Sequence, residues 1–372
     1  MKWLFWVSMA LVAYTYAGYP LWLYLRSRFC ARPTRSSTIS PRVSIVMAVR
    51  NEAGRLPEKL RQLQELVYAR ERLEIIVVSD GSTDQTNEIL AAHSDDQVRT
   101  IVLRQHEGKA SALNAGIEAS RGEILVFTDV RQRIEPCAVQ HLVSCFADSA
   151  VGCASAELML SPSSGTSTGA GVGLYWNLEK KIRQWESATN SVVGATGAIY
   201  AVRKELVVPI PAGTILDDVY VPLHVARQGR RVIFDPSARA WEPVIIGLKR
   251  EFGRKVRTLT GNYQLLQLAP WILSRANPVR FEFISHKLLR LFVPFLLIAI
   301  LVSSVVLKGT FYQIFLGVQL AFYGIGLLGL AWRRTGLVSR LANVVLTFMV
   351  LNGAAVVALV NFLTGKKEVW AR

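Results

Sequence analysis

The chain has 372 residues, of which 51% are apolar, and it carries 43 Lys and Arg against 27 Asp and Glu. This length allows one sizeable globular domain with additional elements, and the mean hydropathy of +0.29 is high for a purely soluble enzyme. The four cysteines form no CxxC pair and have no histidine at metal-site spacing. Neither a disulfide framework nor a zinc site is therefore indicated, and a membrane component is expected.

Four stretches are apolar enough to cross a membrane. They cover residues 3–25, 291–307, 311–332 and 343–363, and none contains Asp, Glu, Lys or Arg. Each approaches the ~20 residues that a transmembrane helix needs. The first stretch lacks a small-x-small cleavage site, which favours an uncleaved anchor over a secretory signal.

Basic residues follow the first stretch with no acid between them: Arg26, Arg28, Arg32, Arg35 and Arg42. By the positive-inside rule, the segment behind them is cytoplasmic. We therefore expect a multi-pass protein of the inner (plasma) membrane with a cytoplasmic central domain. The net charge of +16 concentrates beside the apolar stretches rather than along a nucleic-acid motif, so membrane lipids, and not nucleic acid, are the expected partner.

Apolar runs alternate with amphipathic segments between the anchors. The pattern predicts strands at 44–49, 74–79, 98–103 and 123–128, and helices at 56–66, 84–92 and 110–119. This order is typical of a parallel sheet covered by helices. Ligands bind such sheets beyond the carboxyl ends of the strands, where the chain has RNE (50–52), DGS (80–82) and DVR (129–131). Neither GxGxxG nor a P-loop is present.

Five blocks carry a resemblance to a known family, in the order VSIVMAVRNEA, IIVVSDGSTDQT, GKASALNAGIEASRGEILVFTDV, GATGAIYAVRKEL and LDDVYVPLHVARQGRRVIFDPSA. They resemble the inverting family-two glycosyltransferases, in the group that contains polysaccharide synthases. The resemblance covers residues 43–264. It implies an α/β fold, in which a glycosyltransferase-A domain (Rossmann-like, mostly parallel sheet) is cytoplasmic and is flanked by N- and C-terminal transmembrane helices.

Together with the apolar stretches, the resemblance divides the chain into five segments. Residues 1–27 are expected to form a transmembrane helix, 28–41 a basic linker, 42–242 the catalytic domain, 243–287 amphipathic interfacial helices, and 288–372 a transmembrane region of about three helices. Between positions 249 and 290 stand nine Lys or Arg against two acids, mixed with aromatic residues. Helices on a headgroup layer have this composition, and a solvated basic face is the alternative.

The resemblance assigns the donor site to residues that follow the strands. Glu52 and Asp80 would contact the nucleoside, because carboxylates can accept hydrogen bonds from a uracil N–H and from ribose hydroxyls. Lys109 would meet the diphosphate at the start of a helix, whose N-terminus favours an anion. A helix cap is the alternative for Asp80, and a solvated surface lysine for Lys109.

Asp129 ends an almost wholly apolar run, EILVFTD, at the place of the family's DxD motif. It is therefore the candidate metal ligand. With the two phosphates it would hold Mg²⁺ or Mn²⁺, which neutralises charge on the departing nucleoside diphosphate. The second acidic position of the motif is Arg131. This arginine either supplies positive charge to the donor itself, or points to solvent while phosphates, water or a distant residue complete the metal site.

Asp217 and Asp218 occupy the place of the family's acidic pair. Direct displacement at an anomeric carbon needs a base on the face opposite the leaving group, to take the proton of the acceptor hydroxyl. The resemblance gives this role to Asp218 and a supporting role to Asp217. Because the pair precedes a predicted helix, capping is the alternative.

Two further segments complete the predicted site. The acceptor end would be formed by Gly194, Ala195, Thr196 and Gly197, where missing side chains let a sugar approach the backbone; a plain turn is the alternative. RKVRT at 254–258 lies where processive members carry QxxRW. Arg257 matches the motif's arginine, and Arg254 and Arg257 are expected on the donor side. Thr258 replaces the tryptophan, so an aromatic platform for an acceptor sugar is missing.

The sequence therefore predicts a hexosyltransferase that moves a sugar from a nucleotide-sugar donor, with a UDP-sugar favoured, to a lipid-linked or glycan acceptor. The reaction would take place at the cytoplasmic membrane face, in envelope or exopolysaccharide biosynthesis. One alternative is a processive polysaccharide synthase coupled to secretion, as a homo-oligomer or with an export partner. The incomplete DxD and QxxRW motifs also leave open an inactive membrane scaffold or sugar-nucleotide sensor.

Overall fold

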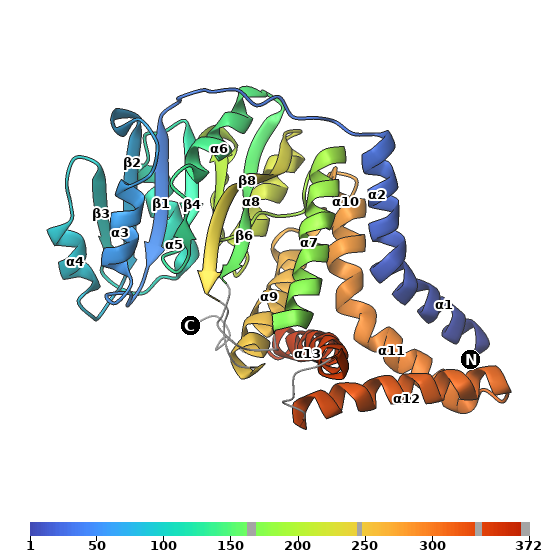
Figure 1. Cartoon of the computed structure of the whole chain (residues 1–372). Helices are drawn as coiled ribbons and strands as arrows, with labels where there is room; N and C mark the ends of the chain where they lie inside the picture. Colours follow the sequence, from blue (N-terminus) through green and yellow to red (C-terminus); the bar gives the residue numbers. More distant parts are fainter. Residues whose placement is uncertain (162–168, 244–247, 332–336, 366–372) are drawn as a thin grey trace.

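The computed structural model consists of an α/β domain with long apolar helices beside it (Figure 1). It describes residues 1–161, 169–243, 248–331 and 337–365. The strands described are β1 Val43–Val49, β2 Leu73–Asp80, β3 Val98–Leu103, β4 Ile124–Thr128, β5 Arg133–Ile134, β6 Val151–Ser161, β7 Ile199–Arg203 and β8 Arg231–Pro243. They form one sheet in the order β3-β2-β1-β4-β7-β6-β8-β5.

The first half of the sheet is parallel, as the alternating pattern predicts. Strand β1 pairs in parallel with β2 and β4, and β2 pairs in parallel with β3. The connecting helices are α3 Leu56–Gln64, α4 Thr86–Ala92 and α5 Lys109–Ala119. Helix α3 forms against the sheet because Leu56, Leu60 and Leu63, spaced by four and three residues, are fully buried. The predicted mostly parallel α/β fold is confirmed.

Strand β7 is antiparallel to both of its neighbours, β4 and β6. Its register pairs Thr128 with Ile199. The end of β4 therefore meets the start of β7, and the residues that follow Thr128 lie next to those that precede Ile199. Farther along the chain, β6 and β8 pair in parallel with two irregularities in register.

The remaining elements of the α/β domain are α6 Ala138–Ser144, α7 Gly169–Thr189, α8 Asp217–Arg227 and α9 Leu248–Leu268, with short turns at Arg70–Arg72, Cys145–Ala147, Lys204–Leu206 and Pro270–Leu273. Helix α9 lies along α13 (Leu337–Leu363), and the rings of Tyr263 and Phe362 stack with centroids 5.8 Å apart. Helix α7 packs against α2 (Tyr19–Phe29) through Ile182, Tyr19 and Leu23. Both contacts hold the apolar helices against the α/β domain.

Among the described residues, four helical segments are long and apolar enough to cross a membrane: Lys2–Phe29, Arg280–Val306, Thr310–Gly329 and Leu341–Leu363. They comprise α1 Lys2–Ala13, the π-helical turn η1 Tyr14–Gly18, α2, α10 Arg280–Glu282, the π-helical turn η6 Phe283–Leu288, α11 Leu289–Val306, α12 Thr310–Ala331 and α13. The prediction of one N-terminal and three C-terminal apolar helices is confirmed.

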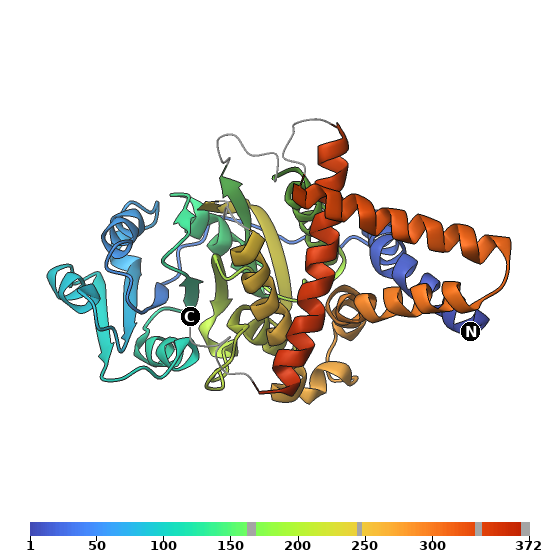
Figure 2. The same ribbon diagram turned by 90° about the horizontal axis from the view of Figure 1, so that it is seen from below.

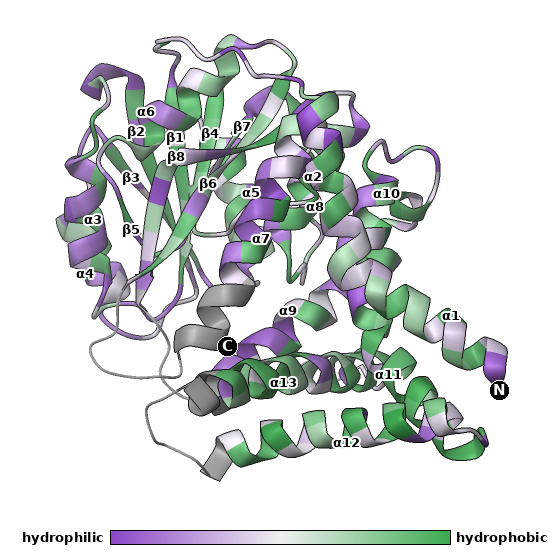
Figure 3. Ribbon diagram, turned by 45° about the vertical axis from the view of Figure 1, so that its right-hand side comes forward, coloured by the Kyte–Doolittle hydropathy of each residue, from purple (hydrophilic) through white to green (hydrophobic). Residues whose placement is uncertain are grey.

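Helices α1, α11 and α12 extend to one side of the α/β domain (Figure 2). Figure 3 shows that apolar residues cover α11, α12 and α13, whereas polar residues are frequent on the helices of the α/β domain. Large apolar side chains on these helices are exposed, for instance Trp3 by 85%, Val305 by 65% and Ile314 by 63%. A surface of this kind is stable in lipid and not in water.

Candidate donor and catalytic site

Lys109 lies at the centre of a cluster of carboxylates. Its Nζ is 2.9 Å from Oδ1 of Asp129 and 3.2 Å from Oδ1 of Asp217. The three residues come from three elements, since Lys109 begins α5, Asp129 follows β4 and Asp217 begins α8. Only one-third of the Lys109 side chain is exposed. A single ammonium group thus joins the predicted diphosphate end of the site to the predicted acidic pair.

Asp218 is the residue after Asp217 on α8, and its side chain lies close to Asp129. A Cβ atom added at Gly197 would lie 3.1 Å from Oδ2 of Asp218 and 3.9 Å from Oδ2 of Asp129. Gly197 therefore lies between the two carboxylates, and a Cβ atom there would crowd Asp218 and make an ordinary contact with Asp129. The backbone N–H of Ala195 donates to the carbonyl oxygen of Asp218 at 2.7 Å. The predicted acceptor loop and the predicted base are thus in direct contact.

Burial and neighbouring charges set the ionisation of this cluster. Burial, followed by the negative charge of Asp217, raises the pKa of Asp218 to about 6. For Asp129, burial opposes ionisation, but the Lys109 ammonium outweighs it and holds the pKa below the usual value. Burial likewise disfavours the charge on Lys109, and Asp129 and Asp217 reverse the effect, so its pKa is raised. Near neutral pH, Asp218 is thus ionised but close to its titration.

This pKa leads to a prediction about pH. A base acts as the carboxylate, so transferase kcat/KM should be constant above about pH 6 and fall about tenfold per pH unit below it. Initial rates between pH 5 and 8 measure this, with samples returned from pH 5 to neutral pH as a control for irreversible loss. An acid limb near pH 4, the ordinary value for an aspartate, would contradict it.

Arg131 lies on the solvent side of Asp129. Its Nη2 is 3.8 Å from Oδ2 of Asp129, and 45% of its side chain is exposed. The guanidinium is therefore near enough to add positive charge where a diphosphate would lie. Of the two roles open for Arg131, this position favours the supply of charge.

The residues present fit a divalent ion only if the donor supplies most of its ligands. Among the residues that the structure describes, no three His, Cys, Asp or Glu side chains lie close enough together to hold a metal ion. Mg²⁺ is commonly bound through one or two carboxylates plus substrate phosphates. Asp129 follows β4 and has 23% of its side chain exposed, so it is the candidate for such a carboxylate.

Asp80 is buried at the end of β2 and holds the turn that leads into α5. Its two oxygens accept hydrogen bonds from the backbone N–H groups of Glu107 at 2.7 Å and Gly108 at 3.0 Å, and one lies 2.7 Å from Nδ1 of His106. Gly108 has a φ of 94°, a conformation that favours glycine. Asp80 therefore also fixes the position from which Lys109 begins its helix.

Glu52 lies at the neighbouring strand end, after β1. Its backbone N–H donates to Oγ1 of Thr86 at 2.9 Å, and its Oε2 accepts from Arg55 at 3.0 Å. A fifth of the Glu52 side chain is exposed. Glu52 and Asp80 thus lie at the ends of the adjacent strands β1 and β2.

Arg254 and Arg257 both lie on α9. Arg254 is paired with Glu242 at 3.2 Å and Glu251 at 3.0 Å. Glu242 in turn accepts from Nε2 of Gln132 at 3.3 Å, three positions after Asp129. Arg254 is therefore linked through Glu242 and Gln132 to the segment that follows Asp129, and Arg257 is partly exposed on the same helix.

Lys59 is a site residue that was not predicted. It is fully buried, and its Nζ donates to Oγ1 of Thr128 at 3.2 Å and to the carbonyl oxygen of Gln132 at 2.8 Å. Burial lowers its pKa to about 7, and the charge of Asp129 opposes that shift. Lys59 thus binds the chain on both sides of Asp129 and stabilises the position of that segment. A lysine on the apolar face of α3, between Leu56 and Leu60, is the signal that could have identified it.

The sheet order, the carboxylate cluster at its edge and the flanking apolar helices define a glycosyltransferase-A fold. Over its whole length the chain is similar to the solved mannosyltransferase PcManGT from Pyrobaculum calidifontis, with a TM-score of 0.73, 23% identity, and coverage of 97% of this chain and 99% of that chain. At this identity the likeness concerns the fold alone.

Sequence comparison matches part of the chain to a known family. Residues 44–207 match the family described as glycosyl transferase family 2. A probable glycosyltransferase of Bacillus subtilis, YdaM, is 25% identical over 236 residues. The poly-beta-1,6-N-acetyl-D-glucosamine synthase of Staphylococcus aureus is 24% identical over 229 residues. Each alignment covers 60% of this chain and 55% of the relative, so the chain matches about half the length of these proteins. The chain carries a glycosyltransferase family 2 domain.

Proposed function

We propose that the chain transfers a sugar, with inversion, from a nucleotide-sugar donor to an acceptor at a membrane surface. The observation that carries the proposal is the position of Lys109 between Asp129 and Asp217, beside Asp218. This arrangement brings a fixed positive charge and a carboxylate base close together. Both are what a displacement at an anomeric carbon requires.

In the proposed reaction, Asp218 takes the proton of the acceptor hydroxyl as the new glycosidic bond forms. The bond between the anomeric carbon and the phosphate oxygen breaks, and the nucleoside diphosphate leaves with the electron pair of that bond. Lys109 and Arg131 stabilise the resulting negative charge from fixed positions. Asp129 would hold the divalent ion, which supplies further positive charge to the leaving group when bound.

A UDP-sugar is the favoured donor. Glu52 and Asp80 lie at adjacent strand ends, where carboxylates can accept from the N–H of a uracil and from ribose hydroxyls. PcManGT, the neighbour in fold, was solved in complex with GDP-Man and Mn²⁺. Guanine also presents an N–H to a carboxylate, so GDP-mannose belongs in any donor panel for this chain.

The acceptor is proposed to be lipid-linked or a growing glycan. Four helical segments are long and apolar enough to cross a bilayer, which would keep the α/β domain at the membrane surface. The arginines after the first of them favour a cytoplasmic position. One relative is a polysaccharide synthase by name, which supports a setting in envelope or exopolysaccharide biosynthesis. Thr258 at the tryptophan position of QxxRW favours transfer of single sugars over long polymers.

The acceptor class can be determined from the product. Membranes that contain the chain are incubated with labelled UDP- and GDP-sugars, and the label is separated into solvent-extractable lipid, polymer, free sugar and unreacted donor. Label in the lipid fraction as single-sugar adducts is the expected result. Long polymer would favour the processive synthase, and label that stays entirely in the donor would favour the inactive scaffold.

Removal of divalent ions is expected to lower transfer by at least about 10²-fold, since the ion contributes several kcal/mol of charge stabilisation. Purified protein is treated with EDTA, dialysed and assayed with and without added Mn²⁺ or Mg²⁺. Recovery of activity on re-addition distinguishes loss of the ion from loss of the fold. Undiminished turnover after exhaustive chelation would contradict a metal site at Asp129.

A further inference from the structure

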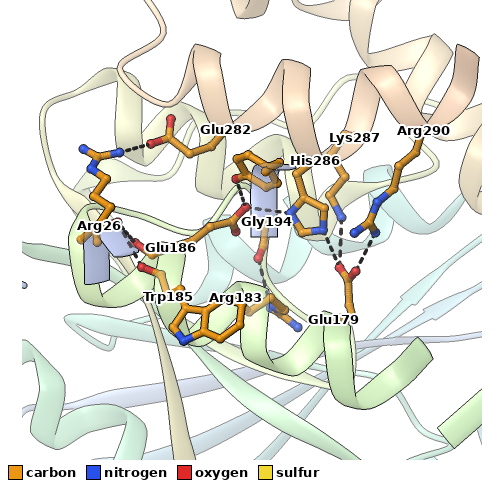
Figure 4. A network of polar contacts seen from close by, with 12 residues as sticks. Arg26, Glu179, Arg183, Trp185, Glu186, Gly194, Glu282, His286, Lys287 and Arg290 are labelled. Atoms are coloured by element: carbon orange, nitrogen blue, oxygen red, sulfur yellow. Dashed lines mark hydrogen bonds and ion pairs between the residues drawn. The ribbon is translucent and has the colours of Figure 1, made fainter. Parts of the chain in front are cut away.

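A buried network of charged groups joins α7 to two of the apolar helices (Figure 4). His286 of the turn η6 contacts carboxylates with both ring nitrogens, at 2.7 Å from Glu186 and 2.9 Å from Glu179. Tyr19 of α2 donates to Glu186 at 2.7 Å, and Arg290 of α11 donates to Glu179 at 2.7 Å. The network fixes α7 against the apolar helices.

Arg183 lies on α7 between these two glutamates and reaches toward the catalytic site. Its Nη2 donates to Oγ of Ser155 at 2.8 Å and to the carbonyl oxygen of Gly194 at 3.1 Å. Its guanidinium also lies over the ring of Phe234, 5.0 Å from the centroid. The planar fork of an arginine can make several such contacts from one position, which the single ammonium of a lysine cannot reproduce.

Both groups that Arg183 holds belong to the surroundings of Asp218. Oγ of Ser155 accepts from the backbone N–H of Thr196 at 3.0 Å. The next residue back, Ala195, donates to the carbonyl oxygen of Asp218. Three consecutive residues of the loop are thus held in place. Gly194 is bound by Arg183 directly, Ala195 by the backbone of Asp218, and Thr196 by Ser155, which Arg183 also contacts. The chain of contacts runs from the apolar helices through α7 to the proposed base.

We propose that Arg183 is a positioning residue, which holds the 194–196 backbone against Ser155 and thereby sets the place of Asp218 relative to the donor. The inference rests on the proposed function of this site. Arg183 acts on the acceptor and base side, whereas Lys109, Asp129 and the strand-end carboxylates hold the donor. Loss of Arg183 should therefore affect the chemical step more than binding of the donor, because a misplacement of about 1 Å can cost about 10²-fold in rate.

The test compares Arg183→Met and Arg183→Lys with a matched control, Arg203→Met. Arg203 also donates to backbone carbonyls, of Val151 at 2.9 Å and Phe146 at 2.7 Å, and lies over an aromatic ring. It pairs with Ile124 at the far end of β4 from Asp129. Arg183→Met should lower kcat by about 10- to 100-fold with donor KM within about threefold, Arg183→Lys should give an intermediate kcat, and Arg203→Met should retain wild-type kcat.

A second measurement follows the loop without turnover. Hydrogen–deuterium exchange of peptides that cover 193–197 should be faster in Arg183→Met than in wild type, and unchanged in Arg203→Met. An active wild type with equal kcat in the two methionine variants would overturn the inference and leave the proposed function intact. Failure of wild type to use any donor would overturn the proposed function. In that case, unchanged exchange of the loop in Arg183→Met would overturn the inference separately.

Discussion

Substitution of Asp218 by Asn should lower kcat for sugar transfer by about 10³-fold, with donor KM changed by less than about threefold. General-base catalysis contributes about 10²- to 10⁴-fold, and an amide of the same shape cannot take the acceptor proton. The contact of Asp218 to the backbone N–H of Ala195 is kept in the variant, because it uses the backbone carbonyl oxygen of Asp218 and not its side chain. Steady-state kinetics with the preferred donor, at pH 7.5 and saturating acceptor, measure the effect.

Asp217→Asn is the matched comparison for that substitution. Asp217 pairs with Lys109, so its loss should lower kcat more modestly, by about tenfold, without removing the base. Its negative charge also raises the pKa of Asp218, so the acid limb of the pH profile should move to lower pH in this variant. An Asp218→Asn variant that keeps more than about a tenth of wild-type kcat, or that is more active than Asp217→Asn, would contradict the assignment of the base.

Substitution of Asp129 by Asn is expected to lower kcat/KM for the donor by at least about 10²-fold and to raise the Mn²⁺ concentration needed for half-maximal activity. A neutral amide is a weaker ligand for a hard cation than a carboxylate. Lys109 keeps its partner Asp217 at 3.2 Å, and Lys59 keeps its contacts to Thr128 and Gln132. The fold should therefore survive, which a thermal melt checks.

Arg131→Ala tests the neighbouring position in the same assay. If Arg131 supplies charge to the diphosphate, donor kcat/KM should fall by about tenfold while the Mn²⁺ response is unchanged. Retention of full activity would show that Arg131 is only a solvated side chain. An Asp129→Asn variant with wild-type kcat/KM and an unaltered Mn²⁺ response would remove Asp129 from the donor site altogether.

The parallel half of the fold was predictable because its strands and helices have clear periodicity. The runs at 44–49, 74–79 and 98–103 are apolar, and the helices between them are amphipathic. Strand β8 was not predicted. It contains Asp235, Pro236 and Arg239 and pairs with β6 through a shift in register, so its sequence lacks a regular alternation. The four apolar segments were predicted because length and composition alone define them.

Less of the site could be predicted, because its geometry depends on contacts between distant elements. The family motifs indicated Asp129, Asp218 and Lys109 as separate candidate site residues. No sequence spacing indicated that Lys109 would bridge Asp129 and Asp217, since the three residues begin or follow different elements. Lys59 and Arg183 belong to no motif, and each acts through contacts that only the folded chain brings together.

The stereochemistry of transfer tests the central claim most directly. Purified protein in lipid nanodiscs is given an α-configured nucleotide sugar from the donor panel, and the anomeric configuration of the first product is read by NMR before mutarotation or further reaction. Displacement assisted by Asp218 from the face opposite the diphosphate predicts a β-linked product. An α-linked product would contradict the single displacement and, with it, the role of Asp218 as the base.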